Sequence, residues 1–144
     1  MDTLKIVEEI SLDLDELRKF IYENPELGFE EYKSSKAHMD LLKKHGFEIE
    51  CPYMDCETSF KAVYDSKKEG RTISYLSEYD ALPGIGHGCG HNILGATATG
   101  AGIVLSKLID DIGGRVIVFG TAAEEIGGTK IEIADSHELD DVDV

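Results

Sequence analysis

The most distinctive segment of the sequence combines thiol, imidazole and carboxylate side chains. It runs from Glu78 to Asn92 and includes Asp80, His87, Cys89 and His91. A thiolate and an imidazole are good ligands for zinc or a similar ion, and glycines beside Cys89 let the backbone turn both side chains toward one centre. Asp80 can orient an imidazole, and His87 is a further candidate for a ligand or supporting group. The segment is therefore a candidate metal site.

The same residues are open to other interpretations. A glycine-rich turn can pack a thiol and two histidines beside a buried helix without binding a ligand. Cys89 and His91 could form a nucleophile pair, although residues two apart on a loop seldom meet side chain to side chain. A phosphate-binding loop is disfavoured, because no Lys-Ser or Lys-Thr pair follows the glycines.

A second candidate segment carries two adjacent carboxylates, Glu124 and Glu125, followed by Gly127-Gly128. Adjacent acids usually lie on a solvated surface, but these follow an apolar run that predicts a strand. One of two neighbouring loop carboxylates can bind a metal ion while the other takes a proton from metal-activated water. Since both candidate segments follow predicted strands, we expect them at the same edge of one sheet.

Hydrophobic spacing predicts the elements that position these segments. Helices are expected at residues 3–23, 30–45, 92–109 and 129–135. Strands are expected at residues 47–51, 60–64, 72–76 and 115–120. The last strand is a continuous apolar run, which is typical of a strand covered on both faces. The order of the elements argues for an α/β domain with a mixed sheet flanked by helices.

Several other residues are expected to have structural rather than chemical roles. The inward face of the first helix is expected to include Val7, Ile10 and Leu17. His38, in the second helix, is expected to be solvated or a cap rather than a ligand. Val142–Val144 resembles the beginning of another strand.

Composition narrows the possible partners and location. The 144 residues include 14 basic and 29 acidic side chains, which gives a net charge of −15. Such a surface disfavours nucleic acid and anionic membranes. No apolar run approaches the ~20 residues of a membrane span, and the N-terminus lacks a signal-peptide core. We therefore expect a cytoplasmic protein.

Four segments together resemble a known family. They are Asn24-Pro-Glu-Leu-Gly-Phe-Glu-Glu, Glu78-Tyr-Asp-Ala-Leu-Pro, His87-Gly-Cys-Gly-His-Asn and Ala123-Glu-Glu-Ile-Gly-Gly. These segments resemble the aminoacylase/carboxypeptidase family of metallopeptidases, and most closely its amidohydrolase branch of hippurate, auxin-conjugate and aminobenzoyl-glutamate hydrolases. The similarity covers essentially the whole chain, with the motifs in the same order.

The resemblance implies a role for each matching residue. Cys89, His91 and Glu125 match metal ligands, Glu124 matches the general base, and Asp80 matches an acid that supports the site. The implied activity is hydrolysis of amide bonds in N-acyl amino acids or small peptides, with two Zn²⁺ or Mn²⁺ ions. The implied fold is a zinc-peptidase-like α/β catalytic domain with a smaller inserted domain that often dimerises, so a homodimer is expected for the full-length protein.

The sequence departs from the family chiefly in length. Family members are much longer, and further histidine ligands normally follow the point where this sequence stops; His137 does not match that later motif. We therefore expect residues 1–144 to be the N-terminal portion of the catalytic domain, without the inserted dimerisation domain. The alternative hypothesis is a non-catalytic truncated fragment that lacks the downstream ligands. A cysteine-dependent enzyme using Cys89 is a third hypothesis.

Overall fold

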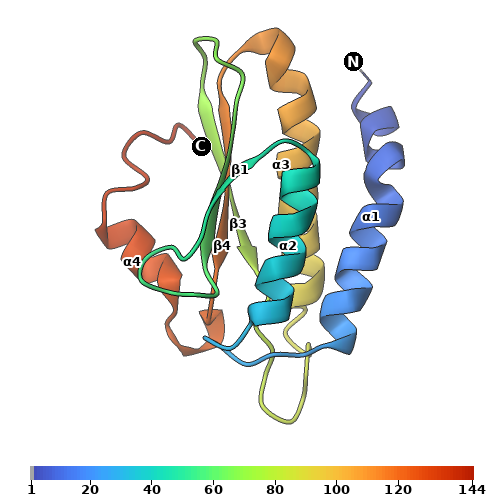
Figure 1. The fold of residues 1–144 in the computed structure, drawn as a ribbon, viewed down its shortest axis with the longest axis vertical. Helices are drawn as coiled ribbons and strands as arrows, with labels where there is room; N and C mark the ends of the chain where they lie inside the picture. Colours follow the sequence, from blue (N-terminus) through green and yellow to red (C-terminus); the bar gives the residue numbers. More distant parts are fainter. Residues whose placement is uncertain (1) are drawn as a thin grey trace.

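A computed structural model describes residues 2–144 as a four-stranded mixed sheet with helices on both faces (Figure 1). The helices are α1 (Thr3–Glu23), α2 (Tyr32–Lys44), α3 (His91–Ile112) and α4 (Thr129–Asp135), with a short 3₁₀ turn η1 (Glu124–Ile126). The strands are β1 (Glu48–Glu50), β2 (Phe60–Asp65), β3 (Thr72–Glu78) and β4 (Arg115–Thr121). The predicted fold class and all eight predicted helices and strands are confirmed.

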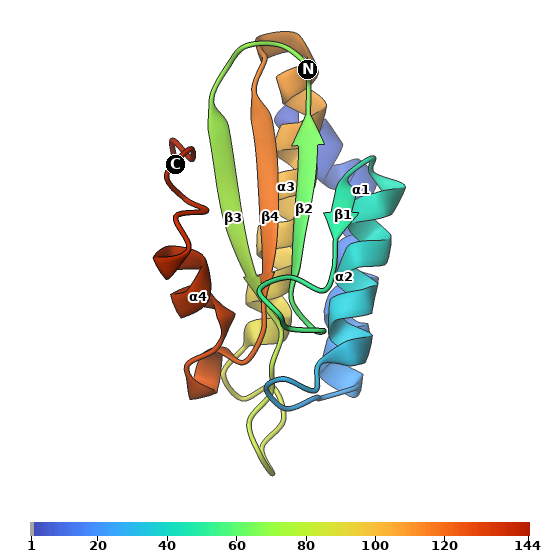
Figure 2. The ribbon, with the colours of Figure 1, turned by 60° about the vertical axis from the view of Figure 1, so that its left-hand side comes forward.

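The order of the strands places two strand ends side by side. Across the sheet the order is β1-β2-β4-β3, and β2 is antiparallel to both β1 and β4. β3 and β4 are parallel, with Glu78 opposite Thr121, and α3 provides the crossover between them. Figure 2 shows both strands ending at the same edge, where α3 begins and η1 follows β4. The loops after β3 and β4 therefore lie beside each other.

β4 lies in the middle of the core, as its apolar sequence predicts. All of its residues except Arg115 are buried. Val116 and Val118 belong to the core cluster shared with α1, α2 and α3, whereas Ile117 and Phe119 pack with Tyr53 and with Ile133 of α4. Burial of apolar side chains on both faces stabilises the strand whose end carries the second candidate segment.

Two predictions about helical side chains are wrong. In α1, Ile6 is buried and Val7 is 41% exposed, because the inward face follows Ile6, Ile10 and Leu17. In α2, His38 is fully buried rather than solvated. Its Nδ1 lies 2.9 Å from the Thr99 hydroxyl of α3, so a partner distant in sequence makes burial of this polar ring possible.

α3 corrects the expectation that no apolar segment reaches the length of a membrane span. Its 22 residues are long and apolar enough for one, judged by length and composition alone. Half of its most apolar window is buried in the fold, and the helix packs against α1, β3 and β4. A helix that is enclosed by neighbours needs apolar residues on most of its sides. Packing against these elements therefore accounts for the apolar residues on the buried side of the helix.

The last residues follow the edge of β3 without forming a strand. The Asp143 N–H donates to the Thr72 carbonyl at 2.9 Å, and the Ser74 N–H donates to the Val144 carbonyl at 2.7 Å. The prediction of a strand at Val142–Val144 is therefore wrong, although the segment is hydrogen-bonded to the edge of the sheet.

Candidate metal centre

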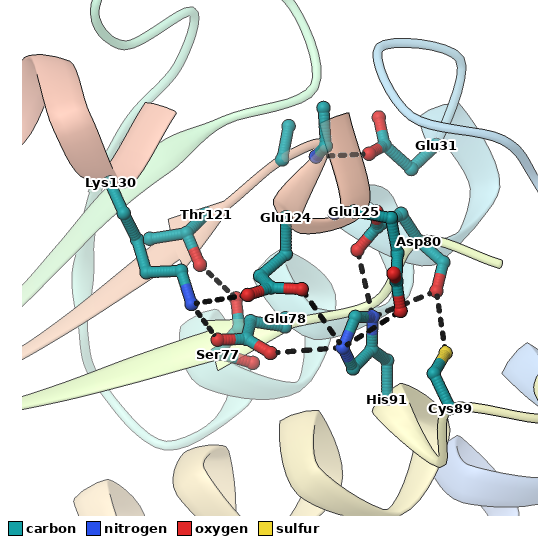
Figure 3. Close-up of polar contacts among 12 residues, drawn as sticks. Glu31, Ser77, Glu78, Asp80, Cys89, His91, Thr121, Glu124, Glu125 and Lys130 are labelled. Carbon is teal, nitrogen blue, oxygen red and sulfur yellow. Dashed lines mark hydrogen bonds and ion pairs between the residues drawn. The ribbon is translucent and has the colours of Figure 1, made fainter. Parts of the chain in front are cut away.

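The two candidate segments meet at the ends of β3 and β4, as the sequence predicts. Glu78 is the last residue of β3, and Asp80 follows it in the loop. His91 is the first residue of α3, while Glu124 and Glu125 lie on η1 just after β4. Figure 3 shows these side chains pointing toward one another.

The imidazole of His91 lies at the centre of this group. Its Nε2 lies 3.1 Å from Glu78 Oε2, 3.6 Å from Glu124 Oε2 and 3.9 Å from Glu125 Oε1. Its Nδ1 lies 2.9 Å from Asp80 Oδ1 and 3.0 Å from the Asp80 carbonyl. Nδ1 has two acceptors at 2.9 and 3.0 Å, so we assign the proton of the neutral ring to Nδ1. The lone pair of Nε2 then faces the carboxylates and can bind a cation.

Asp80 connects the two segments. Its side chain is fully buried. Oδ1 accepts from His91 Nδ1, and Oδ2 accepts the Glu125 backbone N–H at 3.1 Å. One carboxylate therefore orients the imidazole and holds the chain beside Glu125.

The donor atoms fit a divalent cation in two overlapping groups. Cys89, His91 and Glu125 form one group, and Glu78, His91 and Glu124 form the other, with the donor atoms of each within 4.8 Å of one another. Zinc binds sulfur, nitrogen and carboxylate oxygen at about 2.0–2.3 Å, so small side-chain movements bring the first group into range. The groups share His91, and its one available nitrogen binds one ion. A pair of ions would need additional donors.

The donor atoms of Cys89 and His91 lie within 4.8 Å of each other, although residues two apart on a loop seldom meet side chain to side chain. The turn is made at Gly90, whose φ of 82° is in the left-handed region that favours glycine. The thiol donates to the Asp80 carbonyl at 3.7 Å, and burial raises the pKa of the Cys89 thiol. A raised pKa disfavours a thiolate nucleophile, whereas a neighbouring metal ion would favour the thiolate as a ligand.

Sequence reasoning assigned no role to two residues of the site, Glu78 and Lys130. Glu78 is buried at the end of β3, and its position inside the first motif was the available signal. Lys130 reaches in from α4, pairs with Glu78 Oε1, and places its Nζ 3.6 Å from Glu124 Oε1. No signal in the sequence pointed to Lys130, because only the fold brings α4 beside β3.

The other two histidine candidates lie outside these groups. His87 is buried, and its two ring nitrogens have no hydrogen-bond partner within residues 2–144. Burial lowers the pKa of His87, so the ring is held in its neutral form. His137 lies on the surface, where its Nδ1 is 3.1 Å from Asp140 Oδ2. Neither histidine belongs to a donor group of the described chain.

Comparisons with known proteins find relatives of the chain. The Xaa-Arg dipeptidase of Mus musculus is 32% identical over 96% of the chain, which covers 35% of the dipeptidase. One subunit of the p-aminobenzoyl-glutamate hydrolase of Escherichia coli K12 is 32% identical over 85% of the chain, which covers 29% of that subunit. A crystal structure of a dinuclear metal-binding peptidase of the M20 family from Bacillus subtilis superposes with a TM-score of 0.81 at 25% identity, over 94% of the chain and 41% of the peptidase.

The chain is homologous to part of the M20 metallopeptidases. The family resemblance inferred from the motifs is thereby confirmed. The chain spans about a third of the length of these curated relatives. No family model matches it. The assignment of residues 1–144 to the N-terminal portion of an M20 catalytic domain stays a prediction.

Proposed function

We propose that this chain, a relative of the M20 peptidases, forms the metal centre of an amidohydrolase. The enzyme cleaves amide bonds in N-acyl amino acids or small peptides. The proposal rests on the surroundings of His91 Nε2. This atom lies 3.1–3.9 Å from three carboxylates, beside the Cys89 sulfur. Carboxylates held this close together in a partly buried site repel one another, and a divalent cation would neutralise their charge. Cys89, His91 and Glu125 are the proposed ligands.

The remaining residues have distinct roles in the proposed reaction. A bound divalent cation supplies a Lewis acid that polarises a carbonyl and makes hydroxide available near neutral pH. Glu124, with its side chain 36% exposed, is the general base that takes a proton from water and passes it to the leaving amine. Asp80 holds His91 and the Glu125 backbone in position for this step. Glu78 is a further candidate ligand.

The substrate class and the metal are proposed by analogy and by donor chemistry. The relatives' names include a dipeptidase and an aminobenzoyl-glutamate hydrolase, both of which point to small molecules with an amide bond. Zinc or manganese is the proposed cofactor, and the Cys89 sulfur favours zinc because thiolates select softer ions. For the whole protein we propose two ions and a homodimer, as the family resemblance implies.

Substitution of Glu124 by glutamine tests the proposal. Metal content is measured after loading with Zn²⁺ or Mn²⁺, and hydrolysis is measured with N-acyl amino acids and dipeptides. We expect Glu124→Gln to keep its metal and to lose activity by about 10²- to 10⁴-fold, the usual effect of removing a general base. The exposed Glu9 of α1 provides the control variant Glu9→Gln, which should match the wild type.

The possible outcomes separate the hypotheses. Full activity in Glu124→Gln, or a wild type that binds no metal, would overturn the proposal. Weak or absent metal binding without turnover supports the alternative, a non-catalytic truncated fragment that lacks the downstream ligands. Activity that resists chelators and is blocked by a thiol reagent supports a cysteine-dependent enzyme.

A further inference from the structure

We propose that Glu31 is a positioning residue for the loop that carries Glu124 and Glu125. It lies in the segment Asn24–Glu31, to which neither the candidate centre nor the proposed reaction assigns a role. The inference rests on the proposed function only where metal binding is used as a readout.

Glu31 is a fully buried acid, and one of its two side-chain hydrogen bonds is made to this loop. Its Oε1 accepts the Ala123 backbone N–H at 2.7 Å, and its Oε2 accepts the Thr58 hydroxyl at 2.8 Å. No ion pair reaches it within residues 2–144, and burial raises the pKa of this carboxyl. A carboxyl without a cationic partner is costly to bury. Of its two side-chain hydrogen bonds, one spans 27 residues to Thr58 and the other spans 92 residues to the Ala123 amide.

The amide that Glu31 binds belongs to a strained residue. Ala123 has φ 60° and ψ 42°, which is left-handed backbone. For a residue with a Cβ this conformation is unfavourable, so surrounding contacts must hold it. The turn at Ala123 directs the chain from β4 into η1, where Glu124 and Glu125 face His91. A hydrogen bond that fixes the Ala123 N–H therefore also fixes the orientation of the Glu124 and Glu125 side chains.

Glu31 and Asp80 bind this loop at two nearby amides. Glu31 accepts the N–H of Ala123, and Asp80 accepts the N–H of Glu125, at 2.7 and 3.1 Å. Figure 3 shows the two acids near opposite ends of the same short turn. Because Asp80 also binds His91, it sets the loop relative to α3, whereas Glu31 sets it relative to α2 and Thr58.

The rest of the segment also packs against the site loops. A Cβ added at Gly28 would lie 2.9 Å from Ala123 Cβ and 3.1 Å from Ile126 Cδ1. The Glu26 carbonyl accepts the Ala81 N–H at 2.8 Å, in the loop after β3. The segment Asn24–Glu31 therefore touches both loops of the candidate centre, and Gly28 leaves the room that this close approach requires.

The test compares two variants of similar length, Glu31→Gln and Glu31→Met. Glutamine can accept the Ala123 N–H and donate to the Thr58 hydroxyl, whereas methionine can do neither. Hydrogen exchange of the Ala123 amide is followed by NMR without added metal, and Co²⁺ affinity is measured by titration. We expect Glu31→Met to speed this exchange at least tenfold and to weaken Co²⁺ binding by about 10- to 100-fold. Glu31→Gln should stay within about threefold of the wild type in both, since it keeps the bonds.

Two further variants separate positioning from general stability. Thr58→Val removes the other hydrogen bond of Glu31 without touching the loop, and we expect it to change both readouts less than Glu31→Met does. Gly28→Ala crowds Ala123 directly and should speed the exchange of its amide even if Glu31→Met does not fold. Unchanged Ala123 exchange in Glu31→Met or in Gly28→Ala, or equal losses in Glu31→Gln and Glu31→Met, would overturn the inference. A wild type that binds no Co²⁺ would refute the proposed function, while the exchange data still decide the role of Glu31.

Discussion

His91 and His38 are both buried, but their surroundings differ in charge. His38 lies between α2, α3 and the sheet, where its ring packs 5.2 Å from the ring of Tyr79 and bonds to Thr99. Burial lowers the pKa of His38 to about 3, and no carboxylate contacts it within residues 2–144. His91 lies among four carboxylates, the nearest at 2.9 and 3.1 Å.

The comparison shows that burial alone does not make a functional histidine. Without acidic partners, a buried imidazole stays neutral and acts as a polar member of the core. With a carboxylate on Nδ1 and several facing Nε2, the same side chain becomes a candidate ligand. Tyr79 and Asp80, neighbours in the chain, contact His38 and His91 respectively. The two residues directly after β3 therefore contact one histidine each.

The largest expected effect in this comparison comes from His91→Gln. Removing the nitrogen that both donor groups share should weaken Zn²⁺ binding by more than about 100-fold, beyond the 10- to 100-fold typical of supporting residues. Isothermal titration calorimetry with Zn²⁺ measures the change. The control His137→Gln changes a surface histidine and should leave the affinity unaltered. Equal affinities for His91→Gln and the wild type would remove His91 from the proposed ligands.

Asp80→Asn is expected to have the next largest effect. Asparagine offers a single oxygen, so it cannot accept from both His91 Nδ1 and the Glu125 N–H. We expect Zn²⁺ affinity to fall by about 10- to 100-fold. Asp140→Asn is the matched control, because Asp140 also contacts a histidine Nδ1 but on the surface. A similar loss in both variants would show that the effect is one of net charge.

His38 provides a prediction about stability rather than binding. Its pKa is about 3 in the folded chain and near the ordinary value of about 6.5 in the unfolded chain. As pH falls, His38 is therefore protonated in the unfolded chain at a higher pH than in the folded chain. The free energy of unfolding decreases as pH falls from 6.5 toward 3. The expected loss is about 2 kcal/mol between pH 7 and pH 5.

Urea unfolding at several pH values measures this contribution. His38→Gln carries no titratable ring, so its stability should depend less on pH across the same range. Other groups titrate in both proteins and cancel in the difference between them. Parallel pH profiles for the two proteins would contradict the low pKa of His38.

The smallest expected effect belongs to Lys130→Met. Lys130 pairs with Glu78 and lies near Glu124, so its ammonium competes with a cation for these carboxylates. Partly exposed ion pairs are worth about 0–1 kcal/mol, so removal of the charge should tighten Zn²⁺ binding by at most about fivefold. Lys36→Met, in an exposed pair on α2, is the control. Weaker binding in Lys130→Met would show that Lys130 supports the centre instead of competing with it.

Much of the fold could be predicted because its signals are local. Hydrophobic spacing marked the helices and strands, and the apolar run at 115–120 predicted a strand buried on both faces. The meeting of the two candidate segments also followed, since both come after strands that end at one edge. Side-chain burial was less predictable. The exposure of Val7 and the burial of His38 were predicted incorrectly, because the packing of neighbouring helices determines which side of each helix is covered.

By itself, the sequence determined which chemistry was available: a thiol, an imidazole and paired carboxylates, each placed after a strand. Only the tertiary structure decided which atoms face one another. Asp80 binds His91 and the Glu125 amide across 11 and 45 residues, Glu31 reaches Ala123 across 92 residues, and Lys130 reaches Glu78 across 52. Such pairs depend on sheet order and helix packing, which arise from the whole core. For that reason the candidate ligands and Asp80 were visible in the motifs, whereas the contacts of Glu31 and Lys130 were not.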